Sequence, residues 1–521
     1  MFWETKERRP DRNADIKILV DLMHDNVKYL CFNLVLSKYL ELRNNGTLVG
    51  VCKNWTTAFN NYKFEVNSGL AQAFGASKVI NFDGVEADVF LPEDATTLSE
   101  IKKYASGSHE FSLRDYIFNN KSHSLEAYHL LRIAYDHYLR NNLFAEAPSV
   151  SESFIDTLKC CARFRRLAKS IVVREGIEIA VLGHIEYSPY YFIAEQVIKE
   201  GGTVFFHWPL VFGSVRILRD MKSLNMAKDI YFSQWYKDKY LTSLNRFDHT
   251  FSEYVSSLAK KVSFSRNYSE FEEYHVPMSR IEFFQSCGIS RVRPHTIVLM
   301  SHALSDAVHA NGPMLFYDFG SWLRETVEYF ANDVDVNILI KVHPKDSTYD
   351  SSGFIAKLCE EFEGIENFGL VSRYINNREV AKHCDVASTV NGTPGFELQA
   401  QGMPTVIAGE SRYSGLGICN NPNSKQEYFQ ELKKVAIDRE SDKEKMRLAA
   451  QFAFFENVVS SVKSPLVPNV TSSSLNDLGW AQYSSVLHGF YIEEDPLWQA
   501  IGNYYNFKAP VLTNPAFLLS G

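Results

Sequence analysis

The sequence lacks the cysteine patterns that bind metal ions or close disulfide bonds. Its eight cysteines include no CxxC pair, and two of them, Cys160 and Cys161, are adjacent. Adjacent cysteines suit neither a zinc knuckle nor an ordinary disulfide. Scattered cysteines with apolar neighbours are typical of reduced core residues. We therefore expect a reduced protein without a metal centre.

Long apolar runs and blocks of one charge are also missing. No window reaches the roughly 18 consecutive apolar residues of a membrane-spanning helix, and the polar N-terminus does not resemble a secretory signal. The net charge is −8, and the basic run at 163–166 is short, so we expect no nucleic-acid partner. A cytoplasmic protein is expected, with peripheral contact at the inner face of the membrane left open.

Several motifs of nucleotide-binding proteins and hydrolases are absent as well. The chain has no Walker A motif, no GxGxxG after its first strand, no GxSxG and no HExxH. An acidic DxD-type motif at a strand end, which would hold a sugar–metal complex, is also missing. We therefore expect chemistry without a metal ion or other cofactor.

What the chain does contain is a repeated alternation of apolar strands and helical patterns. With 521 residues, 45% of them hydrophobic and 22% charged, it has the composition of a globular protein of two or three domains. Strand–helix–strand order predicts parallel sheets covered by helices. The predicted strands are 16–22, 47–52, 78–82, 177–183 and 203–208 in the first half, and 295–301, 336–344, 367–371 and two within 385–417 in the second.

This order predicts an α/β fold with two Rossmann-type domains and a cleft between them. Ligands bind such folds at the carboxyl ends of the strands. The expected parts are a first domain at 1–214 with a helical insertion at about 83–150, a helical bridge at 215–292, a second domain at 293–464, and a tail at 465–521 that packs back on the first domain.

The stretch 385–417 predicts an anion site. A strand leads through a polar turn into a helix start, where Pro394 suits the first helical position. The first N–H groups of a helix lack partners, and a glycine-rich turn lets a phosphate approach them. Glu397 follows where its carboxylate can accept hydrogen bonds from sugar hydroxyls. The other candidate donor-binding residues of this turn are Ser388, Thr389, Asn391, Gly392, Thr393 and Gly395.

Two flanking segments extend this candidate site. Lys341 and His343 stand where the strand ILIKVHP ends, and a cation beside a histidine suits a pyrophosphate or nucleoside monophosphate. Arg412 and Tyr413 lie in the glycine-bounded turn SRYSGLG, which can come close to a nucleotide.

Two further loops carry candidate catalytic groups. His302 and Asp306 follow the strand that ends at 301, and an imidazole with a carboxylate can act as a general base or supply a nucleophile. His184 and Glu186 follow the strand 177–183 of the first half, where a group that deprotonates an acceptor is expected.

Four blocks of the chain resemble the bacterial capsule polysaccharide and surface carbohydrate biosynthesis proteins. They are GHIEYSPYYFIAEQVIKEGGTVFF, SHALSDA with LFYDFGSWLRETVE, ILIKVHP, and the stretch 385–417. The resemblance implies a glycosyltransferase of the GT-B fold whose second domain holds the donor through His343, Thr393 and Glu397. Members that use CMP-activated acids have a comparable HP block, so CMP is a candidate nucleotide.

The implied function is transfer of a sugar from a nucleotide-sugar to a glycan or lipid-linked acceptor, in the growth of a capsular or surface polysaccharide. Three alternatives stay open at this point. A sugar-nucleotide epimerase would need the same donor site, a CDP-polyol phosphotransferase would use similar histidine-containing blocks, and a non-catalytic assembly partner would only bind glycan or nucleotide.

Overall fold

The computed structural model divides the chain into two compact units. The first comprises Met1–Glu100, Asp156–Leu224 and Glu456–Gly521, and the second comprises Ile101–Ile155 and Asn225–Phe455. The residues that the structure describes are 16–23, 26–53, 64–85, 91–106, 113–147, 149–207, 211–225, 230–258, 277–310, 312–438, 442–467 and 490–517.

The first unit is built on a six-stranded sheet with the order β3-β2-β1-β4-β5-β6. Neighbouring strands are parallel except for β6, which runs antiparallel to β5. This is the strand order of a Rossmann fold, in which the order reverses beside β1. The strands are β1 Lys17–Asp21, β2 Thr47–Cys52, β3 Lys78–Asn81, β4 Ile177–Leu182, β5 Thr203–His207 and β6 Val215–Leu218.

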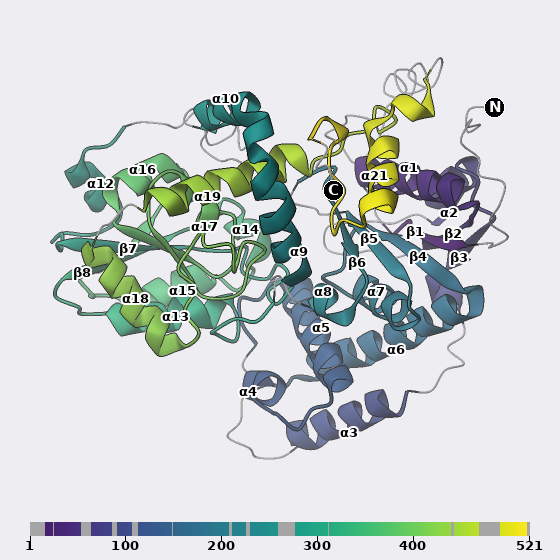
Figure 1. The fold of residues 1–521 in the computed structure, drawn as a ribbon. Coiled ribbons are helices and arrows are strands. Elements are labelled where there is room, and N and C mark those ends of the chain that lie inside the picture. The colour runs from purple at the N-terminus through teal and green to yellow at the C-terminus, as the bar shows by residue number, and fades with distance from the viewer. Residues whose placement is uncertain are drawn as a thin grey trace. The chain divides into compact units, whose positions relative to one another are not determined.

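Helices from both ends of the chain complete the core of the first unit. The helices α1 (Val27–Asn44) and α21 (Pro496–Phe507) contribute to one hydrophobic cluster and lie side by side in Figure 1. Asp495 caps α21 through the N–H of Leu497 and accepts a 2.6 Å hydrogen bond from the Tyr39 hydroxyl. The other helices of this unit are α2 Phe64–Ala73, α3 Pro92–Ser106 (whose last residues enter the second unit), α6 Glu152–Glu175 (whose first residues belong to the second unit), α7 Tyr190–Lys199 and α8 Met221–Asn225 (which ends at the boundary).

The second unit is built on a five-stranded parallel sheet with the order β11-β10-β7-β8-β9. Its order reverses beside β7, as the order of the first sheet does beside β1, so both sheets are Rossmann-like and the predicted fold class is confirmed. The strands are β7 His295–Met300, β8 Val336–Lys341, β9 Phe368–Val371, β10 Val386–Thr389 and β11 Thr405–Ile407.

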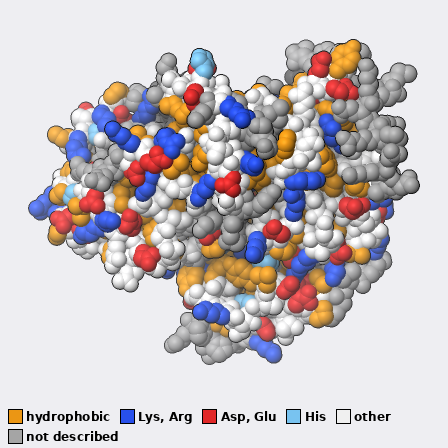
Figure 2. All heavy atoms as spheres, in the orientation of Figure 1, with side chains coloured by type: hydrophobic (Ala, Val, Ile, Leu, Met, Phe, Trp, Pro, Cys, Tyr) orange, Lys and Arg blue, Asp and Glu red, His pale blue; other side chains and the backbone are white. Residues whose placement is uncertain are grey.

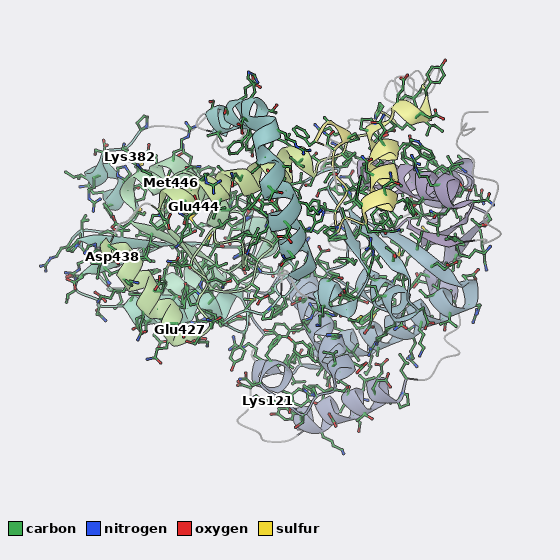
Figure 3. The ribbon with its side chains drawn as sticks, viewed as in Figure 1. Lys121, Lys382, Glu427, Asp438, Glu444 and Met446 are labelled. Atoms are coloured by element: carbon green, nitrogen blue, oxygen red, sulfur yellow. The ribbon has the colours of Figure 1, made fainter. Side chains whose placement is uncertain are left out.

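Helices cover this second sheet on both faces. On one face, α12 and α16 contribute to an apolar cluster with side chains of β7, β8 and β10. Figure 3 labels Asp438, which ends α18, and Glu444 and Met446 near the start of α19. The helices are α9 Ile230–Trp235, α10 Asp248–Leu258, α12 Arg280–Ser286, α13 Phe319–Phe330, α14 Asp346–Tyr349, α15 Phe354–Glu361, α16 Asn377–His383, α17 Pro394–Ala400, α18 Lys425–Asp438 and α19 Lys443–Phe454.

The helical segment at about 83–150 was expected as an insertion of the first domain, but the structure divides it between the two units. Its helices α4 (Leu113–Phe118) and α5 (Leu125–Asn142) belong to the second unit. Tyr135 of α5 donates a 2.8 Å hydrogen bond to the buried carboxylate of Asp318, the N-cap of α13. Asp136 pairs with His309 at 2.6 Å. Buried polar groups need such partners, so these contacts fix α5 on the second unit.

The expected helical bridge at 215–292 also differs from the structure. Its first residues form β6, which pairs with β5 in the first unit, and the rest of the segment belongs to the second unit. The sequence VRIL is only four residues long, so its strand pattern is weak.

Acidic and basic side chains are interspersed over the face drawn in Figure 2. Among the described residues, no helix is long and apolar enough to cross a membrane, and no group of three or more metal-ligating side chains is placed to hold a metal ion.

Candidate functional site

The candidate site of the second unit lies where β7 and β10 end side by side. Because the strand order reverses at this pair, the loops after the two strands diverge, and ligands of α/β folds bind at such points. His302, after β7, accepts hydrogen bonds at its Nε2 from the Thr389 hydroxyl at 2.9 Å and from the N–H of Val390 at 3.2 Å. The imidazole therefore holds the start of the turn that follows β10.

The turn itself is shaped by two glycines and a tyrosine. The Tyr413 hydroxyl donates a 2.7 Å hydrogen bond to the carbonyl oxygen of Gly392. A Cβ atom at Gly395 would lie 2.0 Å from that hydroxyl, and one at Gly392 would lie 2.8 Å from the hydroxyl oxygen of Thr389. Both positions therefore require glycine because neighbouring side chains occupy the space.

Asn391 carries the clearest mark of a binding group in this turn. Its side chain is buried, with 4% of its surface exposed. Its Nδ2 has no hydrogen-bond partner among the described residues. A buried donor without an acceptor costs about 1–3 kcal/mol, and such groups are rare in folded proteins. An oxygen of a bound ligand would satisfy this donor.

Three other predicted donor-binding residues surround the turn. Thr393 is partly exposed, and its hydroxyl accepts a 3.3 Å hydrogen bond from the buried guanidinium of Arg412. Glu397 is buried in the first turn of α17. The structure thus places Asn391, Thr393 and Glu397 in one short segment, with the Arg412 guanidinium against Thr393.

His343 stands after β8, partly exposed, at the same edge of the sheet. Its Nδ1 accepts a hydrogen bond from the N–H of Lys345 at 3.1 Å, so a neutral ring carries its proton on Nε2. His343 lies close enough to His302 for its charge to contribute to lowering the pKa of His302, after the larger effect of burial. The loops after β7 and β8 therefore place these two imidazoles near one another.

Two residues predicted to bind the donor lie elsewhere. Lys341 is buried at the end of β8, where its ammonium group donates a 2.8 Å hydrogen bond to the carbonyl oxygen of Ser372, and burial lowers its pKa to about 7. The Ser388 hydroxyl is buried against the Tyr428 hydroxyl at 2.8 Å. In both cases the side chain has a partner within the unit, and direct contact with a donor stays a prediction.

Two predicted roles in the loops also need correction. Tyr413 is buried and spends its hydroxyl on Gly392, so it shapes the turn instead of meeting a ligand. His302 cannot act as a general base through Nε2, because that atom already accepts two hydrogen bonds. Burial also lowers the pKa of His302 to about 3.

The predicted His302–Asp306 pair does not form. His302 packs flat on the Phe319 ring, with 4.0 Å between the ring centroids, and bonds to Thr389 and Val390. Asp306 instead lies 3.8 Å from the guanidinium of Arg140 of α5. The catalytic role of Asp306 stays a prediction.

In the first unit, the corresponding edge lies where β1 and β4 end. Glu186 accepts a hydrogen bond from the N–H of Ile185 at 3.0 Å, and its carboxylate lies 3.3 Å from Nδ1 of His184. The two predicted catalytic residues of this loop therefore form a pair. A carboxylate that orients an imidazole is the arrangement of a general base.

The sequence reading missed a buried carboxylate beside this pair. Asp21 ends β1, and its two oxygens accept hydrogen bonds from the N–H groups of Met23 at 2.7 Å and Gly183 at 3.1 Å. Burial raises the pKa of Asp21 to about 6, against the opposing effect of these bonds and of His184. The signal was an acidic residue at the end of the apolar run KILVD.

Comparison with known proteins finds one family whose sequence model matches part of this chain. Residues 221–452 match the sequence model of the family described as capsule polysaccharide biosynthesis protein. Over this segment the chain is therefore similar to the capsule polysaccharide biosynthesis family. The family segment contains the whole second sheet and every residue of the candidate site at β7, β8 and β10. No curated protein matches the chain.

Solved structures give weaker likenesses. The beta Kdo 2,4 transferase of KpsC from Thermosulfurimonas dismutans is 13% identical over 55% of this chain and 81% of its own, with a TM-score of 0.34. The UDP-GlcNAc 2-epimerase of Neisseria meningitidis is 9% identical over 83% and 94%, with a TM-score of 0.25. The calicheamicin glycosyltransferase CalG4 is 13% identical over 85% and 95%, with a TM-score of 0.26.

Proposed function

We propose that the protein is a glycosyltransferase of capsule or surface polysaccharide synthesis that uses a nucleotide-sugar donor, with a CMP-linked sugar as the first candidate. The donor binds the second unit, and a glycan or lipid-linked acceptor binds the first. One observation carries the proposal: the segment that matches the capsule family contains the second sheet, and the turn at which the strand order of that sheet reverses holds the unpartnered amide of Asn391. Neither a metal ion nor another cofactor is part of it.

The donor half of the reaction is assigned to the turn after β10 and to His343. The Asn391 amide and the Thr393 hydroxyl bind phosphate or ribose oxygens, and Glu397 accepts hydrogen bonds from ribose. His343 donates its Nε2 proton to the oxygen of the departing phosphate. Donors placed beforehand around developing negative charge are a large source of rate enhancement in enzymes.

The acceptor half is assigned to the paired side chains of the first unit. In this proposal His184 removes the proton of the acceptor hydroxyl, and Glu186 orients the imidazole through Nδ1. The acceptor oxygen then attacks the anomeric carbon, and the bond from that carbon to the nucleotide phosphate breaks.

A thermal-shift screen against CMP, CDP, UDP, GDP and dTDP tests the donor site. A nucleotide that binds only the folded protein raises the free energy of unfolding by mass action, by about 2.7 kcal/mol at a hundred times its Kd. The unfolding temperature rises as a result. We expect one of these nucleotides to stabilise the protein. If none does at millimolar concentration, the proposal fails.

A histidine pair then tests the chemistry. His343→Ala should lower kcat of transfer by about 10²–10³-fold, the range seen when one oxyanion donor is removed. His249→Ala is the matched control, because His249 is an exposed histidine of α10 in the same unit. Full transfer activity in His343→Ala, measured with the nucleotide-sugar that the screen selects, would refute the assignment.

A further inference from the structure

A second polar cluster lies at the carboxyl edge of the first sheet, on the side of β5. Lys28 stands in the first turn of α1, and its ammonium group lies 4.1 Å from the centre of the Phe212 ring. The Phe212 ring packs edge-on against His207, the last residue of β5, with 5.1 Å between the ring centroids. The helix dipole of α1 adds positive potential at this end.

Lys463 belongs to a segment near the end of the chain whose backbone contacts Phe212 and Gly213. The N–H of Val462 donates a 3.0 Å hydrogen bond to the carbonyl oxygen of Gly213, and the Ser461 hydroxyl donates a 2.9 Å bond to the carbonyl oxygen of Phe212. A Cβ atom at Gly213 would lie 2.5 Å from the Val462 carbonyl oxygen, so the two backbone segments are in close contact. Lys463 follows directly and is exposed.

His207 supplies an unsatisfied donor in the cluster. Its Nε2 accepts a 3.0 Å hydrogen bond from the N–H of Gly213, so the neutral ring carries its proton on Nδ1. The side chain is buried, stacked on Phe32 at 4.3 Å, and Nδ1 has no hydrogen-bond partner among the described residues. A buried N–H group in this position calls for an acceptor.

Among the described residues, no acidic side chain pairs with the two lysines of the cluster. Burial lowers the pKa of Lys28, and the charge of Lys463 lowers it further. Two described carboxylates at this edge of the sheet have backbone partners, since Asp21 accepts two N–H groups and Glu186 accepts one.

We propose that Lys28, Lys463 and the Nδ1 proton of His207 form a subsite for an oxyanion, a phosphate or carboxylate group carried by the acceptor. The identity of the ligand as an acceptor rests on the function proposed above, whereas the oxyanion site itself does not. Ammonium groups bind phosphate and carboxylate through charge-assisted hydrogen bonds. A lipid phosphate and an acidic sugar offer the same chemistry to these three groups.

Calorimetric titration with inorganic phosphate at low ionic strength tests the subsite. The parent protein is His343→Ala, so that phosphate bound at the second unit contributes less to the signal. We expect phosphate to bind the parent, and each of Lys28→Gln and Lys463→Gln to weaken binding by about tenfold or more. Lys78→Gln is the matched control, because Lys78 is an exposed lysine of the first unit that pairs with Glu175, and it should bind phosphate like the parent.

Two outcomes would overturn the subsite. One is a parent protein that binds neither phosphate nor glucuronate at 10 mM (on the order of the weakest specific affinities). The other is a folded double variant, K28Q/K463Q, that binds phosphate as tightly as the parent. Circular dichroism checks folding, and both changes alter only the ends of side chains that are at least partly exposed.

Two further arms distinguish the sources of the oxyanion. Flotation with phosphatidylglycerol vesicles, but not with phosphatidylcholine vesicles, that is lost in K28Q/K463Q and kept in K78Q identifies a lipid phosphate. Glucuronate that displaces phosphate from the parent identifies a sugar carboxylate. The nucleotide screen on the wild-type protein is independent of all these titrations, so failure of the donor proposal and failure of the subsite are separate results.

Discussion

At the scale of single residues, Asn391 links stability to ligand binding. Replacing it with leucine, which has a similar size, removes the unpartnered amide and should raise the free energy of unfolding by about 1 kcal/mol. The same change should abolish stabilisation by nucleotide. Both effects are read from thermal and urea unfolding with and without the nucleotide.

Asn337 provides the contrast for this experiment. It is equally buried, but its amide donates to the carbonyl oxygens of Arg293 and His295 and to the Thr296 hydroxyl. Asn337→Leu should therefore lower stability and leave the nucleotide effect intact. A nucleotide response that survives in Asn391→Leu would show that the amide does not bind the ligand.

His302 gives a prediction about pH. Burial lowers the pKa of His302 from 6.5 to about 3 in the folded protein, so below pH 6.5 the unfolded chain binds a proton that the folded chain does not. The stability due to the neutral ring is complete above pH 6.5 and declines toward pH 3, by about 1.4 kcal/mol per pH unit.

The variant His302→Gln isolates this effect. Other groups titrate in the same range, and Asp21, whose pKa is raised to about 6, acts in the opposite direction. The difference between the two proteins removes these shared effects. Urea unfolding between pH 7 and pH 4 should show a slope of stability against pH that is smaller by about one proton in His302→Gln. Equal slopes in the two proteins would contradict a neutral His302.

At the scale of elements, the connection from β10 to α17 depends on one glycine. In Gly395→Ala the new methyl group would lie 2.0 Å from the Tyr413 hydroxyl and 2.8 Å from its Cζ atom. The tyrosine must move and lose its bond to Gly392, so we expect a loss of about 2 kcal/mol of stability, in the usual range of overpacking, together with weaker nucleotide binding.

A double-mutant cycle checks that Tyr413 is the obstacle. Tyr413→Phe removes the closest contact and leaves the one at Cζ, so the double variant G395A/Y413F should recover part of the stability lost in G395A. The coupling is read from urea unfolding of the four proteins. Additive losses would place the strain of Gly395→Ala elsewhere in the turn.

The same elements show what local sequence patterns can determine. Apolar runs bounded by polar turns predicted ten of the eleven strands, since a buried parallel strand has a strong pattern. They did not determine the exact role of each polar residue within a strand. Ser388 and Thr389 are neighbours in β10 and take opposite faces, so one meets Tyr428 and the other His302.

At the scale of the whole molecule, unit membership depended on contacts distant in sequence. Asp136 and His309 are 173 residues apart, and Tyr135 and Asp318 are 183 apart. Neither pair leaves a mark on local periodicity, so the helices at 113–142 were predicted for the other unit. The turn after β10 was predictable because its residues follow one another in the chain.

The last segment of the chain should be indispensable to the first unit. Buried side chains beyond residue 455 enter its core, each worth about 1.5–3 kcal/mol when buried, against a total stability of about 5–15 kcal/mol. These side chains are Val462, Leu466, Val467, Ile492, Leu497, Trp498, Ile501, Tyr504 and Leu512. A chain that ends at Phe455 should therefore leave the first unit unfolded.

Limited proteolysis checks this expectation. In the truncated chain, trypsin should cleave rapidly within 16–100 and 156–224, while the nucleotide still protects the second unit. The full-length chain should resist cleavage in both units. A truncated chain whose first sheet remains protected would show that the tail is not part of its core.

The order of segments also has a consequence for synthesis on the ribosome. The second unit has all its residues once Phe455 has emerged, although the chain began with the first unit. Strands β1 to β6, finished by residue 218, must wait for Leu497, Trp498 and Leu512 before their apolar face is covered. The half that is translated first is thus completed last, and its uncovered sheet is the species that a nascent-chain chaperone should bind.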